Sequence, residues 1–270
     1  MRIMMVGDVV GKAGRQATQT WLPLLKEQHE VDFIIVNGEN AAGGIGITPE
    51  IAAGFLDREG VDVVTLGNHA WGKREIYPYL DIQPRLLRPA NYPPGAPGSG
   101  CGLYAWEDTL VGVISMQGRT FMEPVDDPFR SIDAILEIML KKTRIIFIDF
   151  HAEATSEKQA FAWHVDGRAS AVVGTHTHVQ TADETILPQG TGYLTDVGMT
   201  GPIESIIGMR LDIVIPKFTS GLPARFEVAD GESRLCAVLV DIDKQSGHAL
   251  GIQRIQVPAQ VTHRPVHAPV

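Results

Sequence analysis

The hydrophobic pattern alternates between two kinds of segment along much of the chain. Short runs rich in Val, Ile and Phe end in Gly, Asp, Asn or His and predict β-strands. Longer segments with apolar residues at helical spacing lie between them and predict α-helices. We expect strands at 2–6, 33–36, 61–66, 144–148 and 171–173, and helices at 12–28, 48–58, 73–80, 128–142 and 156–164. Strands that alternate with helices are typical of βαβ units, so the pattern predicts an α/β fold containing parallel sheet.

The remaining segments predict mainly antiparallel structure. We expect a hairpin from 103–106 and 110–115, short strands at 185–187 and 192–195, an antiparallel pair from 226–228 and 235–242, and a last strand at 250–257. Pro, Gly and Ser dominate 89–102, which is a loop or the boundary between two halves. Two prolines in 261–270 predict a loose tail. The simplest assembly is a single domain over 1–260 with two sheet-forming halves.

Composition narrows the classes of function. The 270 residues carry a formal net charge of −9 and no basic block, which argues against an extended nucleic-acid partner. No apolar run approaches the roughly 18 residues of a membrane span, and residues 1–6 predict a strand rather than a signal peptide. The two cysteines, Cys101 and Cys236, lie far apart and favour a reducing compartment. We therefore expect a cytoplasmic protein without a membrane partner.

Side chains suited to metal binding follow the ends of several predicted strands. They are Asp8, Glu39, Asn40, Asn68, His69, His151, His176 and His178. One polar residue at a strand end is ordinary, because turns and caps use such residues. Repetition after successive strands is not ordinary, and in a parallel sheet these ends share one edge, where α/β proteins bind their ligands. The pattern therefore predicts a metal site at that edge.

The ligand types restrict the metal and its chemistry. His, Asn and carboxylate without thiolate favour Fe, Mn, Zn or Co over a sulfur-rich structural zinc site. The set is too large for one tetrahedral ion but suits two ions about 3.5–4 Å apart, which promote displacement at phosphorus. Two divalent ions would leave the site positive beside Asp8 and Glu39, so it could hold a phosphate group. Glu153 is open to two interpretations, an acceptor for a ligand imidazole or a charge at a helix N-terminus.

These motifs resemble those of the calcineurin-like metallophosphoesterases. Asp8, the Gly-Asn-His at 67–69 and the Gly-Thr-His-Thr-His at 174–178 carry the likeness. The likeness is closer to the YmdB-like branch, through the segments 7–11, 37–43, 67–71, 150–155, 174–179 and 195–201, and it covers nearly the whole chain. Two departures from the wider superfamily match that branch. The usual Asp-x-His is Asp-Val-Val at 8–10, and the usual Gly-Asp-x-x-Asp is Gly-Glu-Asn at 38–40.

The resemblance implies a fold, ligand roles and a reaction. The implied fold is a sandwich of two mixed β-sheets flanked by helices. One metal would be bound by Asp8, Asn40 and His178 and the other by Asn68, His151 and His176, with Glu39 between them. His69 would be the general acid rather than a ligand. The implied metals are iron or manganese, and the implied activity is phosphodiester hydrolysis with 2′,3′-cyclic nucleotides as the favoured substrates.

The leading hypothesis is thus a dinuclear-metal phosphodiesterase acting on cyclic nucleotides or related small phosphodiesters. In it, a hydroxide bridging the metals attacks phosphorus and His69 protonates the leaving oxygen. Two alternatives stay open at this point: a phosphomonoesterase or nuclease with the same site, and a regulatory protein that senses nucleotides through the metals. A homo-oligomer is compatible with each hypothesis.

Overall fold

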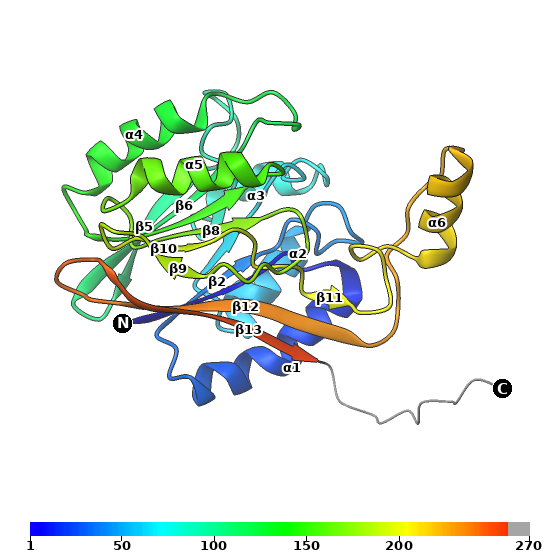
Figure 1. The fold of residues 1–270 in the computed structure, drawn as a ribbon, viewed down its shortest axis with the longest axis horizontal. Coiled ribbons are helices and arrows are strands. Elements are labelled where there is room, and N and C mark those ends of the chain that lie inside the picture. Colours follow the sequence, from blue (N-terminus) through cyan, green and yellow to red (C-terminus); the bar gives the residue numbers. More distant parts are fainter. Residues whose placement is uncertain (259–270) are drawn as a thin grey trace.

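The computed structural model describes residues 1–258, and the predicted tail at 261–270 lies outside them. The described chain forms two β-sheets packed face to face between helices (Figure 1). The first sheet has the order β11-β12-β1-β2-β3-β4, and β13 pairs with the opposite edge of β12 along almost its whole length. Its strands are β1 (Arg2–Val6), β2 (Phe33–Asn37), β3 (Val63–Thr65), β4 (Leu86–Leu87), β11 (Gly201–Pro202), β12 (Ser233–Ile242) and β13 (Ala249–Pro258).

The second sheet has the order β5-β6-β7-β8-β10-β9. Its strands are β5 (Cys101–Trp106), β6 (Thr109–Gln117), β7 (Ile145–His151), β8 (Ala171–Thr175), β9 (Thr185–Ile186) and β10 (Gly192–Leu194). Each sheet contains parallel and antiparallel neighbours, such as β1 with β2 and β1 with β12 in the first sheet. The segment 89–102 connects β4 of one sheet to β5 of the other, so it is the boundary between the two halves.

Helices cover the outer face of each sheet. They are α1 (Gly11–Gln28), α2 (Pro49–Ala53), the π-helical turn η1 (Gly54–Arg58), α3 (Ile76–Ile82), α4 (Pro128–Met139) and α5 (Thr155–Val165). A further helix, α6 (Leu211–Ser220), stands away from the sheets (Figure 1). In Figure 1, α4 and α5 lie on one side of the sandwich and α1 on the opposite side. Among residues 1–258, no helix combines the length and apolar character needed to cross a membrane.

Three apolar cores explain why the sandwich forms. On β1, Ile3 and Met5 enter the core between the sheets, while Met4 and Val6 enter the core beneath α1. A third core joins β6, β7 and β8 to α4 and α5. Strands that bury both faces carry continuous apolar runs rather than alternating ones. The predicted two-sheet sandwich flanked by helices is therefore confirmed.

One expectation about the C-terminal half needs correction, and one element there was not predicted. The antiparallel pair of 226–228 with 235–242 was wrong, because β12 pairs instead with β1, β11 and β13 and has no edge left for 226–228. Val228 makes only an isolated bridge with Met209. Helix α6 was not predicted. Its apolar residues Leu211, Val214, Ile215 and Phe218 stand at helical spacing, but the interior Pro216 argues against a helix.

Candidate metal centre

The predicted ligands gather at one end of the two sheets. Parallel strands β1, β2 and β3 of the first sheet and β7 and β8 of the second all finish near the same place. The turns after these strands, or their last residues, carry every predicted ligand: Asp8, Glu39, Asn40, Asn68, His151, His176 and His178. The clustering that the strand-end argument predicted is therefore present in the structure.

One group of ligand atoms surrounds the inner nitrogen of His151. His151 Nε2 lies 2.8 Å from Asn68 Oδ1, 3.2 Å from Glu39 Oε2 and 3.1 Å from His176 Nδ1. Glu39, His151 and His176 offer ligand atoms that all lie within 4.8 Å of one another. A nitrogen and oxygen set at such separations suits a transition-metal ion of the Fe, Mn or Zn type.

A second group shares Glu39 with the first. Asp8, Glu39 and His178 offer ligand atoms within 4.8 Å of one another. Three buried oxygens, Asp8 Oδ1, Glu39 Oε1 and Asn40 Oδ1, accept no hydrogen bond. Buried acceptors without donors are uncommon in folded proteins and call for a missing partner. Carboxylate and amide oxygens that face one another satisfy a cation, so the residues fit two metals with Glu39 between them.

Each ligand imidazole has its outer nitrogen fixed by a second residue. His151 Nδ1 lies 2.8 Å from Thr175 Oγ1, His176 Nε2 lies 3.0 Å from Glu153 Oε2, and His178 Nδ1 lies 2.9 Å from the carbonyl oxygen of Ile207. An acceptor on one nitrogen sets the tautomer and leaves the other nitrogen free for a metal. Of the two interpretations of Glu153, the contact with His176 therefore places it as the outer acceptor.

A buried relay that the sequence did not reveal supports His151. Thr175 Oγ1, which accepts from His151, donates to Asp149 Oδ1 at 2.7 Å. Asp149 Oδ2 also accepts from Thr65 Oγ1 at 2.6 Å and from Asn37 Nδ2 at 2.9 Å, so both oxygens of its buried carboxylate have donors. The sequence nevertheless held a signal for the role of Asp149. Asp149 stands two residues before His151 on an apolar strand, so both side chains lie on one face.

The turn that carries His176 and His178 is held in a demanding conformation. Both residues have positive φ, 99° and 66°, a backbone conformation that residues other than glycine rarely adopt. Asp196 Oδ2 accepts from Thr177 N at 3.1 Å and from Thr177 Oγ1 at 2.8 Å, and it pairs with Lys158 Nζ at 2.7 Å. The buried ion pair of Lys158 and Asp196 therefore stabilises the turn through Thr177.

Close approach of the backbone also shapes the site. A Cβ at Gly67 would overlap the His151 imidazole and the Glu39 carboxylate. Glycine at this position lets the turn after β3 pass directly beside the ligands and deliver Asn68 to them.

Charge coupling sets the protonation of the metal-free site. Burial raises the pKa of Asp8 to about 6. Burial opposes the charge of Glu39, but the neighbouring imidazoles of His151 and His69 outweigh it and lower the pKa of Glu39. Burial likewise opposes protonation of His151, yet the carboxylates of Glu39 and Asp8 raise its pKa to about 9. Burial and the charge of His151 lower the pKa of His176 to about 3.

These protonation states predict proton release when metal binds. At pH 7.5 the metal-free His151 is protonated, since its pKa is about 9, whereas Asp8 is already ionised. A metal ligand must be neutral imidazole, so loading with Mn²⁺ is expected to release about one proton. Metal affinity should fall as the pH is lowered from 9. Calorimetric titration in buffers of different ionisation enthalpy measures the release, and a value of zero at pH 7.5 would contradict the assigned charge of His151.

His69 lies beside the ligand cluster with one nitrogen engaged. Its Nδ1 is 3.1 Å from Asn40 Nδ2 and 3.3 Å from Glu39 Oε1, and its backbone N donates to Glu39 Oε2 at 3.2 Å. Asn40 Nδ2 is a donor that also binds the carbonyl oxygen of Gly44 at 2.9 Å. Acceptance from Asn40 at Nδ1 puts the proton of the neutral ring on Nε2, for which the described residues provide no hydrogen bond. The ring is 34% exposed.

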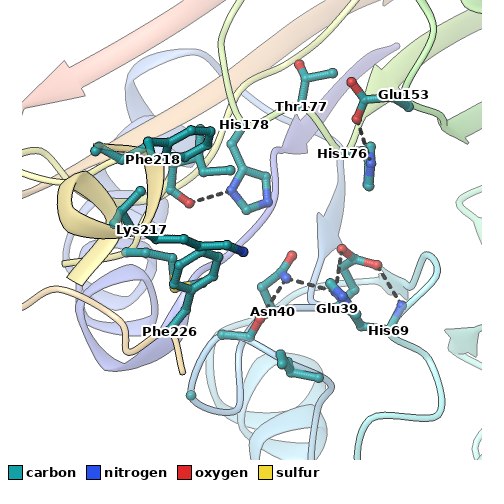
Figure 2. Close-up of a pocket in the computed structure, with 17 residues that line it drawn as sticks. Glu39, Asn40, His69, Glu153, His176, Thr177, His178, Lys217, Phe218 and Phe226 are labelled. Atoms are coloured by element: carbon teal, nitrogen blue, oxygen red, sulfur yellow. Dashed lines mark hydrogen bonds and ion pairs between the residues drawn. The ribbon is translucent and has the colours of Figure 1, made fainter. Parts of the chain in front are cut away.

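A cavity of about 490 Å³ opens over these residues (Figure 2). Glu39, Asn40, His69, His176 and His178 line one part of it. Its opposite part is lined by apolar residues from the segment around α6, which are Ile206, Ile207, Met209, Val214, Phe218 and Phe226. The volume falls in the range of about 300–1,000 Å³ that small-molecule sites occupy.

A two-sheet sandwich with carboxylate, amide and imidazole ligands collected at the strand ends has the architecture of a metallophosphoesterase. The chain belongs to the YmdB-like family, since the family model described as "YmdB-like protein" matches residues 4–255. The predicted resemblance is thereby confirmed.

Similar proteins agree with this assignment over almost the full described chain. The chain is 51% identical over 257 residues to the 2′,3′-cyclic-nucleotide 2′-phosphodiesterase of Bacillus subtilis strain 168, covering 95% of this chain and 97% of that protein. A crystal structure of a hypothetical protein from Thermus thermophilus is 42% identical with a TM-score of 0.90, covering 96% and 100%. That of a novel phosphatase from Mycoplasma pneumoniae is 31% identical with a TM-score of 0.90, covering 96% and 93%.

Proposed function

We propose that this protein is a metal-dependent phosphodiesterase that hydrolyses 2′,3′-cyclic nucleotides or related small phosphodiesters. The observation that carries the proposal is the pair of ligand groups that share Glu39, next to the free Nε2 of His69 in one cavity. The activity of the Bacillus subtilis relative supports the cyclic-nucleotide substrate. Free cysteines at 101 and 236 support a cytoplasmic location.

In the proposed site, Asp8, Asn40 and His178 hold one metal, Glu39 lies between the metals, and the second metal is held by Asn68, His151 and His176. The buried oxygens that lack donors and the imidazole nitrogens that face inward support these roles. Iron or manganese is the proposed metal, as the family resemblance implies; the nitrogen and oxygen ligands without thiolate suit both, and suit zinc and cobalt as well. When bound, the metals supply Lewis acidity toward the phosphate oxygens and lower the pKa of coordinated water.

The chain's own residues would then complete the reaction. His69, as the imidazolium, would donate the proton on Nε2 to the leaving oxygen of the diester and be left as neutral imidazole, a role that suits histidine near neutral pH. In that protonated form Nδ1–H would face Glu39 Oε1, 3.3 Å away, and Nε2–H would be the proton left for the substrate. Asp149 and Thr175 keep His151 in the tautomer that presents Nε2 to the site.

Hydrolysis of 2′,3′-cyclic AMP by Mn²⁺-loaded protein tests the proposal. Wild type is expected to convert it to a monophosphate. Glu39→Gln should lower both metal content and kcat/KM, by more than the roughly 10–100-fold that loss of an outer-shell partner costs. Glu137→Gln is a matched control, since Glu137 is an exposed carboxylate on α4 with only an i,i+4 lysine partner. It should behave as wild type.

Four results would contradict the proposal. No turnover of the cyclic diester at full metal content would do so, as would a Glu39→Gln variant that keeps both metals and activity. Faster turnover of p-nitrophenyl phosphate than of any diester would indicate the monoesterase instead. Tight nucleotide binding without product would indicate the sensor.

A further inference from the structure

Helix α6 belongs to an excursion of the chain, residues 206–229, that flanks the cavity. Figure 1 shows α6 standing away from the two sheets. Arg210 N donates to the carbonyl oxygen of Glu227 at 3.0 Å, and Ala229 N donates to that of Gly208 at 2.9 Å. These hydrogen bonds close the excursion at its base, so α6 and the residues just before Glu227 are tied to the rim of the site.

One face of α6 is turned toward the cavity. Val214, Lys217 and Phe218 line it, and their i, i+3, i+4 spacing puts them on the same side of the helix. Phe226 lines it from the irregular segment that returns from α6. Phe218 is 79% exposed and Phe226 is 41% exposed, although both are large apolar side chains. Exposed aromatic rings gathered in a cavity indicate that a ligand covers them.

The same excursion is linked to the metal ligands. The carbonyl oxygen of Ile207 receives the hydrogen bond of His178 Nδ1, while the Ile207 side chain lines the cavity. Lys217 Nζ stands 4.4 Å from the centre of the Phe226 ring, a cation–π contact that holds this ring in place. Figure 2 shows Lys217, Phe218 and Phe226 on one side of the pocket and Glu39, Asn40 and His69 toward the other.

We propose that Phe218 and Phe226 form the subsite that binds the nucleoside part of the substrate. This inference rests on the proposed phosphodiesterase function. The cyclic phosphate would lie at the ligand cluster, and the base would stack on the exposed phenylalanine rings across the same cavity. Every nucleobase presents a π-face, so stacking on an aromatic ring tolerates all of them. The subsite therefore selects nucleosides as a class and discriminates little among bases.

Two cyclic diesters distinguish a defect in this subsite from a defect in the reaction centre. Both 2′,3′-cyclic AMP and glycerol 1,2-cyclic phosphate contain the five-membered cyclic phosphodiester, but only the nucleotide has a base. Phe218→Ala and Phe226→Ala are each expected to lower kcat/KM for the nucleotide by about tenfold. Neither should change kcat/KM for the glycerol diester. Phe226→Tyr keeps an aromatic ring and should retain nucleotide turnover.

Trp163→Ala is the matched control, because Trp163 is an exposed aromatic on α5 that does not line this cavity. It should leave both substrates unaffected. An equal loss on both diesters, or no loss on either, would overturn the nucleoside subsite. If the equal loss came with a change in oligomeric state, this face would be a protein interface instead. A wild-type protein that hydrolyses neither diester would instead contradict the proposed function itself.

Discussion

His69→Ala is expected to lower kcat for 2′,3′-cyclic AMP by about 10²–10⁴-fold, the range attributed to general acid–base catalysis. Both metals should remain bound, because the ring contacts ligand residues through Nδ1 but holds no metal in the proposed site. A substrate with an aryl leaving group needs no proton on the departing oxygen. Turnover of bis(p-nitrophenyl) phosphate should therefore fall much less than turnover of the cyclic nucleotide.

His164→Ala provides the control for this variant. The side chain of His164 is 34% exposed, as is that of His69, but it pairs with Asp133 on the outer helices. Metal content and both turnover numbers are measured for each variant. Loss of metal from His69→Ala would make His69 a ligand, and equal losses on the two substrates would remove its role as the acid.

Lys158→Met is expected to lower the free energy of unfolding by about 3–5 kcal/mol, the usual cost of removing one partner of a buried ion pair. Lys158 and Asp196 are both buried, and Lys158 Nζ also donates to the carbonyl oxygen of Thr175 at 2.8 Å. The remaining carboxylate of Asp196 would be a buried charge without a counter-ion. Because Asp196 holds the turn at Thr177, metal binding by the adjacent histidines should weaken as well.

Chemical denaturation of metal-free protein and metal analysis of loaded protein measure these two effects. Lys141→Met is the matched control, since Lys141 is exposed and pairs only with Glu137. Its unfolding free energy should change by less than about 0.5 kcal/mol. Adding Asp196→Asn to Lys158→Met should recover part of the loss by removing the orphaned charge. A Lys158→Met protein as stable as the Lys141→Met protein would refute the argument.

The two-sheet core and the position of the ligands could be predicted from sequence because both depend on local patterns. An apolar run that ends in Gly-Asp or Gly-Glu-Asn marks a strand end wherever the strand lies, and parallel strands bring such ends together. Asp8 and Glu39 were therefore found without knowledge of the strand order. The convergence of the ligand atoms, as at His151 Nε2, required the structure.

Residues whose role depends on distant partners were not predictable. Lys158 occupies an ordinary helical position in the sequence, and only packing brings its amine to Asp196. Helix α6 contains Pro216, which argues against a helix interior, although its apolar residues Leu211, Val214, Ile215 and Phe218 do stand at helical spacing. The segment 226–228 resembles a short strand, but the partners of β12 are fixed by the sheet as a whole.

The ligands come from both layers of the sandwich, and this has a mechanical consequence. Asp8, Glu39, Asn40 and Asn68 follow strands of the first sheet, whereas His151, His176 and His178 end or follow strands of the second. In the proposed site, ions bound between them would join the two sheets across their interface. Free energy released by metal binding would then be available only to the docked sandwich. Separation of the two layers would therefore require release of the ions.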